Sequence, residues 1–395
     1  MKRRFTCAAL ALLFGALFLE ANWSPAEVPI LTRWGHTVTP ENAWTEYPRP
    51  QLRRSEWKNL NGLWDYAITE HDAPTPAAAA EGHILIPYSI DSALSGVRRQ
   101  MDADEDIWYW RKFEIPEHWQ GQRILLHFEA VDWRTEVWVN RQLVGTHTGG
   151  YAPFSFDITE TLIEDGPQAL MVKAWDPQDT LFKPLGKQAN DEEQYDRCSG
   201  IWGTVWLEPV SAAHIRRLRI TPNASGVVQI ETDLSGSTTG TSFRYKVLEK
   251  GESILQRTSE TGALELKIRE PELWSPETPF LYGLKVYLLQ YGEVVDEVES
   301  YFGLRSVGLV DTPLGKQMAL NGKAIFQMGP LDQNYWPGGG LTPPSDEAMI
   351  WECQYLKAIG CNMVRLHIKQ NPRRWYYHCD RMGLLVWQDF ITAIK

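Results

Sequence analysis

Polar side chains gather near the end of the chain, just after stretches that are typical of strands. They are Asp332 and Gln333 after the first stretch, Arg365, His367 and Lys369 at the second, and Asp389 after the third. Because the carboxyl ends of parallel strands meet at one edge of a sheet or barrel, we expect these side chains to lie together. The pattern therefore predicts a site for a polar substrate at this edge.

Four of these residues also have a structural interpretation. Arg365 could form a buried ion pair, and a lone His367 on a strand could be a satisfied structural group. Lys369 is equally well explained by simple solvation, and Asp389 by the N-cap of a helix. The residues alone leave these alternatives open.

Aromatic residues are abundant, with 18 Trp, 15 Tyr and 13 Phe. Most of the tryptophans, including Trp64, Trp138 and Trp206, fall in strand patterns and are expected to be core. Tyr335 and Trp336 instead follow the first of the three strands in a predicted loop. They are the better candidates for stacking on a ligand ring, although packing explains them equally well.

The elements that must position these residues alternate between strand and helix. We expect a buried strand at 324–328, a helix after Ser345 that ends at Gly360, a strand at 363–367, a helix at 372–382 ended by Gly383, and a strand at 384–388. Strand, helix, strand, helix, strand is the start of a parallel α/β architecture. No glycine-rich fingerprint joins a strand directly to a helix, which disfavours a dinucleotide site.

The part of the chain before these elements, residues 28–310, is predicted to be all β. Residues 28–210 contain many short strands, including a hairpin with Asn140 in its turn, and suggest a β-sandwich or jelly roll. Residues 211–310 contain further strands at 215–220, 227–232, 242–248, 264–268 and 281–289. A region of this length and strand spacing suits an immunoglobulin-like sandwich.

Composition and the first residues limit the class of protein. The net charge of −11 argues against a nucleic-acid partner, which needs clustered basic residues. A basic start, an apolar run and small residues predict a signal peptide at 1–26, and so an exported protein that is periplasmic or extracellular. No later stretch is apolar enough to cross a membrane. The four remaining cysteines are expected to be buried thiols, with one disulfide possible, and no spacing suggests zinc.

A series of ordered segments resembles glycoside hydrolase family 2, which includes β-galactosidases, β-glucuronidases and β-mannosidases. The matching segments are 60–64 (LNGLW), 94–97 (LSGV), 108–111 (WYWR), 137–140 (VWVN), 149–151 (GGY), 199–202 (SGIW), 301–305 (YFGLR), 320–323 (LNGK), 362–365 (NMVR), 379–381 (CDR) and 383–386 (GLLV). They span nearly the whole chain after the predicted signal peptide.

The resemblance implies a jelly-roll sugar-binding domain at 28–210, an immunoglobulin-like β-sandwich at 211–310 and a (β/α)₈ barrel from 311. It implies a retaining exo-β-glycosidase without a cofactor, whose two carboxyl groups lie about 5–5.5 Å apart. It places Arg365 beside the nucleophile, whereas His367 falls one position earlier than the family's usual histidine.

In such enzymes both reacting groups are glutamates, after the fourth and seventh barrel strands. A barrel needs about 250 residues, and only about 80 are present, enough for strands one to three. We therefore expect the N-terminal part of such an enzyme, with an incomplete barrel, without either glutamate and inactive alone. Glu347 and Glu352 lie on the predicted first helix and are not substitutes.

Two other hypotheses remain open. The chain could be a non-catalytic carbohydrate-binding protein, or a separate chain could complete the barrel. The residues do not define the sugar, the linkage or a metal site.

Overall fold

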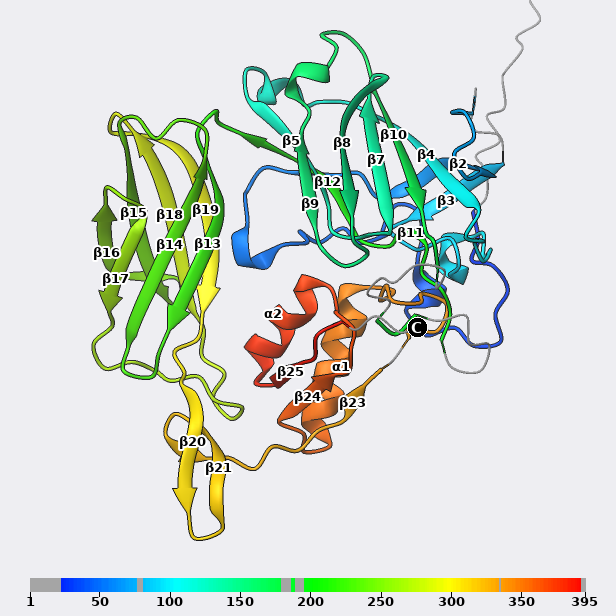
Figure 1. Cartoon of the computed structure of the whole chain (residues 1–395). Helices are drawn as coiled ribbons and strands as arrows, with labels where there is room; N and C mark the ends of the chain where they lie inside the picture. The colour runs from blue at the N-terminus through cyan, green and yellow to red at the C-terminus, as the bar shows by residue number, and fades with distance from the viewer. Residues whose placement is uncertain (1–22, 77–80, 179–185, 189–194, 334, 392–395) are drawn as a thin grey trace, which may run out of the picture.

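The computed structural model describes residues 23–76, 81–178, 186–188, 195–333 and 335–391. The predicted signal peptide lies outside these residues except for its last four positions. Within them the chain is mostly β, with two α-helices, and three parts follow one another along the sequence (Figure 1).

The first part is a sandwich of two antiparallel sheets. Its six-stranded sheet has the order β3 (Gly82–Ile86), β2 (Gly62–Glu70), β4 (Glu105–Phe113), β10 (Gln168–Trp175), β7 (Arg134–Val139), β8 (Gln142–Thr148). Its four-stranded sheet has the order β1 (Lys58–Asn59), β12 (Val205–Val210), β5 (Arg123–Phe128), β9 (Phe154–Asp157), and β6 (Val131–Asp132) pairs with β11 (Gly200–Ile201). Inward-facing side chains of both sheets form one core around Trp64 and Tyr109. The predicted β-sandwich is confirmed.

The predicted hairpin turn shows how local sequence sets this topology. Asn140 and Arg141, between β7 and β8, both have positive φ angles, 49° and 68°. A two-residue turn with this geometry matches the twist of the two strands, and Asn tolerates it well. The Asn140 side chain also accepts a hydrogen bond from the Ala169 backbone N–H at 2.9 Å, which ties the turn to β10.

The second part is a smaller sandwich of seven strands. One sheet has the order β13 (His214–Pro222), β14 (Val227–Ser235), β17 (Ala263–Lys267), and the other β16 (Glu252–Ser259), β15 (Thr241–Glu249), β18 (Tyr282–Gln290), β19 (Glu293–Phe302). Alternating apolar residues of both sheets meet in a second core. All five strands expected here are present, and β16 and β19 are additional.

A buried charge cluster joins the first two parts. Glu208 on β12 accepts hydrogen bonds from Tyr47 at 2.5 Å and Arg49 at 2.9 Å. Burial alone would raise the pKa of Glu208, but the neighbouring Arg49 and His127 hold it well below its usual value. Arg54 reaches from the same place to Asp296 on β19, at 2.7 Å. Because these charges are buried together, the cluster fixes how the two sandwiches meet.

The third part begins with a hairpin and continues as a parallel α/β unit. The hairpin, β20 (Val307–Thr312) and β21 (Gly315–Leu320), projects from the body and pairs with β22 (Lys323–Ala324) (Figure 1). There follow β23 (Leu331–Asp332), α1 (Asp346–Ala358), β24 (Met363–Leu366), α2 (Arg373–Met382) and β25 (Leu385–Gln388). The sheet order is β23-β24-β25, and both pairings are parallel. The predicted parallel α/β architecture is confirmed.

Both helices start and end where the sequence predicts. The Ser345 side chain accepts the hydrogen bond of the Ala348 N–H at 3.2 Å, and Gly383 adopts the left-handed conformation that ends α2. A third hydrophobic core lies between the helices and the parallel sheet, and Met349, Cys353 and Leu356 are part of it, as expected. Cys198, Cys353, Cys361 and Cys379 are all buried free thiols.

The prediction of a buried strand at 324–328 is wrong. Only Lys323–Ala324 and Leu331–Asp332 are strands, and Phe326 is 83% exposed. The Met328 and Pro330 carbonyls still accept hydrogen bonds from β24, so the chain is extended here. An apolar run reveals its hydrophobicity but not which neighbours cover it, and no described element packs over Phe326.

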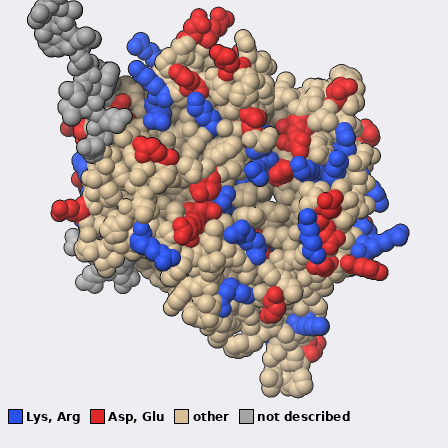
Figure 2. Space-filling view, turned by 180° about the vertical axis from the view of Figure 1, so that it is seen from behind, with Lys and Arg blue, Asp and Glu red and all other residues tan. Residues whose placement is uncertain are grey.

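Acidic and basic side chains are interspersed over the face shown in Figure 2, without a broad area of one sign. Among the described residues no helix is both long and apolar enough to span a membrane.

Candidate functional site

The predicted site residues lie at the carboxyl edge of the β23-β24-β25 sheet. Beside this edge is an open hollow of about 570 Å³, a size that suits a small ligand. Its walls come from Trp133 before β7, the loop after β8, the loop after β24, α2 and the end of β25. The lining residues are Trp133, Gly149, Gly150, Tyr151, Ala152, Gln370, Tyr376, Gln388, Asp389, Phe390 and Ile391. Two segments far apart in sequence therefore share one concave surface.

Arg365 and Asp389 form a two-pronged ion pair at this edge. Arg365 Nε and Nη2 donate to the two Asp389 carboxylate oxygens at 3.1 and 2.9 Å. This hydrogen bonding lowers the pKa of Asp389 and raises that of Arg365. Because the Arg365 side chain is 45% exposed, the buried ion pair considered for it is excluded. Asp389 is therefore a fixed, ionised acceptor on the wall of the hollow.

Asp332 and Lys369 form a second ion pair, and this one is buried. Lys369 Nζ lies 3.1 Å from Asp332 Oδ1, and the two side chains are 3% and 6% exposed. The Asn371 amide donates to the other carboxylate oxygen at 3.3 Å. Simple solvation of Lys369 is thus excluded. The pair fixes the loop after β24 to the end of β23.

Gln333 and His367 contact each other beside this pair. The Gln333 amide donates to His367 Nδ1 at 2.7 Å, and the Tyr195 hydroxyl donates to Gln333 Oε1. Burial, together with the positive charges of Lys187 and Arg365, lowers the pKa of His367. Both effects favour the neutral imidazole, and because Nδ1 accepts the hydrogen bond from Gln333, the proton is on Nε2 and available as a donor.

Backbone strain marks the same loop. Ile368, between His367 and Lys369, has a φ of 51°. A β-branched residue rarely adopts this conformation, which persists only where the surroundings enforce it. The buried Asp332–Lys369 pair supplies such a constraint.

Tyr335 and Trp336 lie mostly against protein. The Tyr335 hydroxyl donates to backbone carbonyls of Lys187 and Asp196, and its ring packs against Tyr151, Cys198 and Trp202. Trp336 packs against the core under α1 and α2. Neither lines the hollow beside Asp389.

The loop that contains Gly149, Gly150 and Tyr151 closes one side of the hollow, a role that was not predicted for it. At Gly150 a Cβ atom would lie 2.5 Å from Asp132 Oδ2, so only glycine fits. Buried Gln188 donates to Asp132 at 2.8 Å and to Tyr151 at 3.1 Å, which holds the loop in place. The Gly149-Gly150-Tyr151 motif was visible, but its partner across the hollow is not local in sequence.

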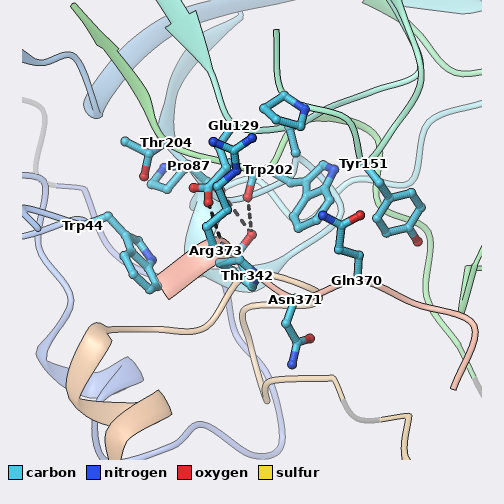
Figure 3. A pocket seen from close by; sticks show the side chains of 14 residues that line it. Trp44, Pro87, Glu129, Tyr151, Trp202, Thr204, Thr342, Gln370, Asn371 and Arg373 are labelled. Carbon is cyan, nitrogen blue, oxygen red and sulfur yellow. Dashed lines mark hydrogen bonds between the residues drawn. The ribbon is translucent and has the colours of Figure 1, made fainter. Parts of the chain in front are cut away.

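A small cavity of about 20 Å³ lies between the first and third parts, and it has room for about one water molecule. Figure 3 shows Glu129, Arg373 and Thr342 close together there, with Trp44 on one side and Trp202 on the other. The Arg373 backbone N–H donates to Glu129 at 3.3 Å, and the Thr342 hydroxyl donates to the Trp202 carbonyl at 2.7 Å. These contacts dock the α/β unit on the first sandwich and leave no room for a sugar.

Within the described residues no cluster of three or more His, Cys, Asp or Glu side chains could hold a metal ion.

The carboxyl edge of the sheet offers an ionised acceptor, an exposed guanidinium group and a neutral imidazole. These groups can bind hydroxyl-rich ligands. Both strand-end carboxylates, Asp332 and Asp389, are already engaged by cations.

The fold and the site define a multidomain, mostly β protein with a concave surface beside the ends of parallel strands, and of the predicted site residues only Asp389 lines that surface. The family model "Glycosyl hydrolases family 2, sugar binding domain" matches residues 85–209, and "Glycosyl hydrolases family 2" matches residues 213–305. The chain belongs to glycoside hydrolase family 2, as its motifs indicated.

Individual relatives agree. A "Putative beta-glucuronidase" of Formosa agariphila is 29% identical over 88% of this chain and 42% of its own length. A β-galactosidase of Thermoanaerobacter pseudethanolicus is 26% identical over 71% of the chain and 39% of its own length. The solved structure of Bifidobacterium dentium β-glucuronidase complexed with coumarin-3-O-glucuronide superposes with a TM-score of 0.71. It is 22% identical and covers 88% of this chain and 63% of that one, which shows a shared fold. The chain thus spans less than half the length of these two curated relatives.

Proposed function

We propose that this chain provides the N-terminal domains and part of the sugar-binding site of a retaining exo-β-glycosidase. The observation that carries the proposal is the hollow at the carboxyl edge of the parallel sheet, in a chain of a glycosidase family. In this proposal the first part is the jelly-roll domain and the second the immunoglobulin-like domain. β23, β24 and β25 are the first three strands of a (β/α)₈ barrel.

The residues at the edge would position the sugar. Asp389, kept ionised by Arg365, would accept hydrogen bonds from sugar hydroxyls, and neutral His367 would donate one through Nε2. Asp332 and Lys369 would hold the loop that carries His367. Glucuronides and galactosides are the first candidates, because relatives carry those names.

The chain alone is proposed not to hydrolyse glycosides. Retention needs a nucleophile and a general acid about 5–5.5 Å apart, and the acid must stay protonated at working pH. Asp389 is unsuited to be that acid because Arg365 lowers its pKa. Asp332 is buried in its ion pair with Lys369. The reacting carboxylates would come from outside the 395 residues, and sequencing the DNA downstream of codon 395 tests this origin directly.

Binding is tested by titrating the purified chain with methyl β-glucuronide, methyl β-galactoside and methyl β-mannoside. We expect millimolar binding of at least one glycoside, lost in Asp389→Asn and kept in Asp311→Asn. Asp311 is a matched control because it is an ion-paired aspartate on the projecting hairpin, far from the hollow in sequence. No binding of any of the three at millimolar concentration would refute the proposal.

A non-catalytic carbohydrate-binding protein is the second candidate, favoured by the cation pairing of both edge carboxylates. It predicts the same binding but no further barrel-coding sequence downstream. Export to the periplasm or the exterior is also proposed, on the basis of residues 1–26. Fractionating cells that express the chain tests export, and a product that keeps residue 1 and stays inside the cell would contradict it.

A further inference from the structure

A groove of about 400 Å³ lies where all three parts of the molecule meet. Its polar lining is Arg49, Gln51, Arg216, Arg217 and Arg373. Arg49 and Gln51 come from the segment before β1, the next two arginines from β13, and Arg373 from the first turn of α2. The groove is separate from the hollow beside Asp389, with which it shares no lining residue.

Positive charge in this groove exceeds the negative charge around it. No acidic residue is among its lining residues. Arg216 and Arg217 share one carboxylate, Asp233, at 3.7 and 2.8 Å. Glu208 pairs with Arg49 at 2.9 Å but is also 3.8 Å from Arg54. Arg54 also has Asp296 as a partner, at 2.7 Å. Three carboxylates therefore face the five guanidinium groups of Arg49, Arg54, Arg216, Arg217 and Arg373.

Arg373 is the least compensated of these groups. Its guanidinium makes no ion pair or hydrogen bond with any described residue, since only its backbone atoms do so, with Glu129 and Gln51. Burial, and then the like charge of Arg49, lower its pKa, and the opposing effect of Glu129 is smaller. Arg49 Nε is likewise buried with no acceptor among the described residues. Uncompensated donors of this kind are costly unless something accepts from them.

The position of Arg373 in the fold strengthens the positive electrostatic potential in the groove. It is the first residue of α2, a ten-residue helix, where the helix dipole favours an anion. The Gln51 amide donates to the Arg373 carbonyl at 3.2 Å, which holds the segment before β1 against the start of the helix. Donors from three separate parts of the chain thus face one space.

We propose that this groove is a binding site for an oxyanion, held by the guanidinium groups of Arg373 and Arg217 together with Arg49. Sulfate, phosphate and carboxylate share the planar or tetrahedral oxygens that guanidinium forks recognise. The source is either a free inorganic ion or the charged group of an acidic saccharide, for which the groove has room. A bound oxyanion would bridge the three parts and stabilise their arrangement.

Calorimetric titration of the full chain with sodium sulfate, sodium phosphate and sodium glucuronate tests the site. Sodium chloride at matched ionic strength and neutral glucose are the controls. We expect saturable binding of at least one oxyanion, weakened about tenfold or more in Arg373→Gln and in Arg217→Gln. Binding of sulfate or phosphate alone would identify a free ion as the source, and tighter glucuronate binding an acidic saccharide.

Arg219→Gln is the matched control variant. Arg219 lies on the same strand as Arg217 and is similarly exposed, but pairs with Glu231 and does not line the groove. Arg373→Lys keeps the charge and should restore part of the affinity if Arg373→Gln loses it. Equal heats with chloride, or unchanged affinity in both Arg373→Gln and Arg217→Gln, would overturn the proposal. The test does not depend on glycosidase activity, and so its failure would leave the proposed function untouched.

Discussion

Replacing Lys369 by methionine should strongly destabilise the third part, because it leaves Asp332 buried without its cation. At 3.1 Å the attraction between the two charges is about 5 kcal/mol with an effective dielectric constant of about 20. Removing one partner of a buried pair typically costs about 3–5 kcal/mol. The Asn371 amide still hydrogen-bonds Asp332, so we expect the lower end, about 3 kcal/mol.

Hydrogen exchange followed by mass spectrometry measures this loss locally, which matters because a chain of several domains need not unfold in one step. Peptides that cover β24 should exchange about a hundredfold faster in Lys369→Met. The double variant Asp332→Asn/Lys369→Met buries no charge and should recover much of the protection. Exchange within about threefold of the parent would refute the buried-pair interpretation, as would a double variant no better protected than Lys369→Met.

Three further predictions follow from the charges. Burial raises the pKa of Asp91 to about 7. Its contribution to stability is therefore complete below about pH 4 and is lost as the pH rises through 7. Asp91→Asn should flatten the plot of melting temperature against pH across that range. Burial opposes ionisation of Asp346, yet Arg374 and His378 lower its pKa, so its stabilisation is present above about pH 4 and lost on further acidification. Asp346→Asn should lower the local free energy of unfolding at α1 by about 3 kcal/mol at pH 7, measured by hydrogen exchange, and unchanged exchange would contradict the pairing. Arg365→Gln should leave the melting temperature nearly unchanged, since its pair is exposed, but weaken glycoside binding in the titration; unchanged binding would remove Arg365 from the site.

Much of the fold could be predicted because its signals are local. The Ser345 N-cap, Gly383 after α2 and the Asn140 turn each use short-range chemistry that the sequence displays. β16 (Glu252–Ser259) was missed because it is an exposed edge strand with few apolar residues to mark a period. The prediction of a buried strand at 324–328 was wrong for the opposite reason. The apolar pattern is clear there, but no element in the described part of the chain covers Phe326.

The site could be predicted only in outline. Parallel strands bring Asp332, Arg365 and Asp389 to one edge whatever the loops do. Which cation each carboxylate takes depends on register and on loop shape, so the exposed Arg365–Asp389 pair and the buried Asp332–Lys369 pair were not foreseeable. The arginine groove could not be predicted for the same reason, because its lining residues come from three segments that lie more than 150 residues apart along the chain.

The proposed division between sugar positioning and bond cleavage is tested most directly by nitrophenolate release. The purified 395-residue chain would be incubated with 4-nitrophenyl β-D-glucuronide and 4-nitrophenyl β-D-galactoside, beside Asp389→Asn and buffer. We predict release no faster than in buffer for both proteins. Release by the parent chain that Asp389→Asn abolishes would contradict the central claim, because the edge would then contain a reacting carboxylate.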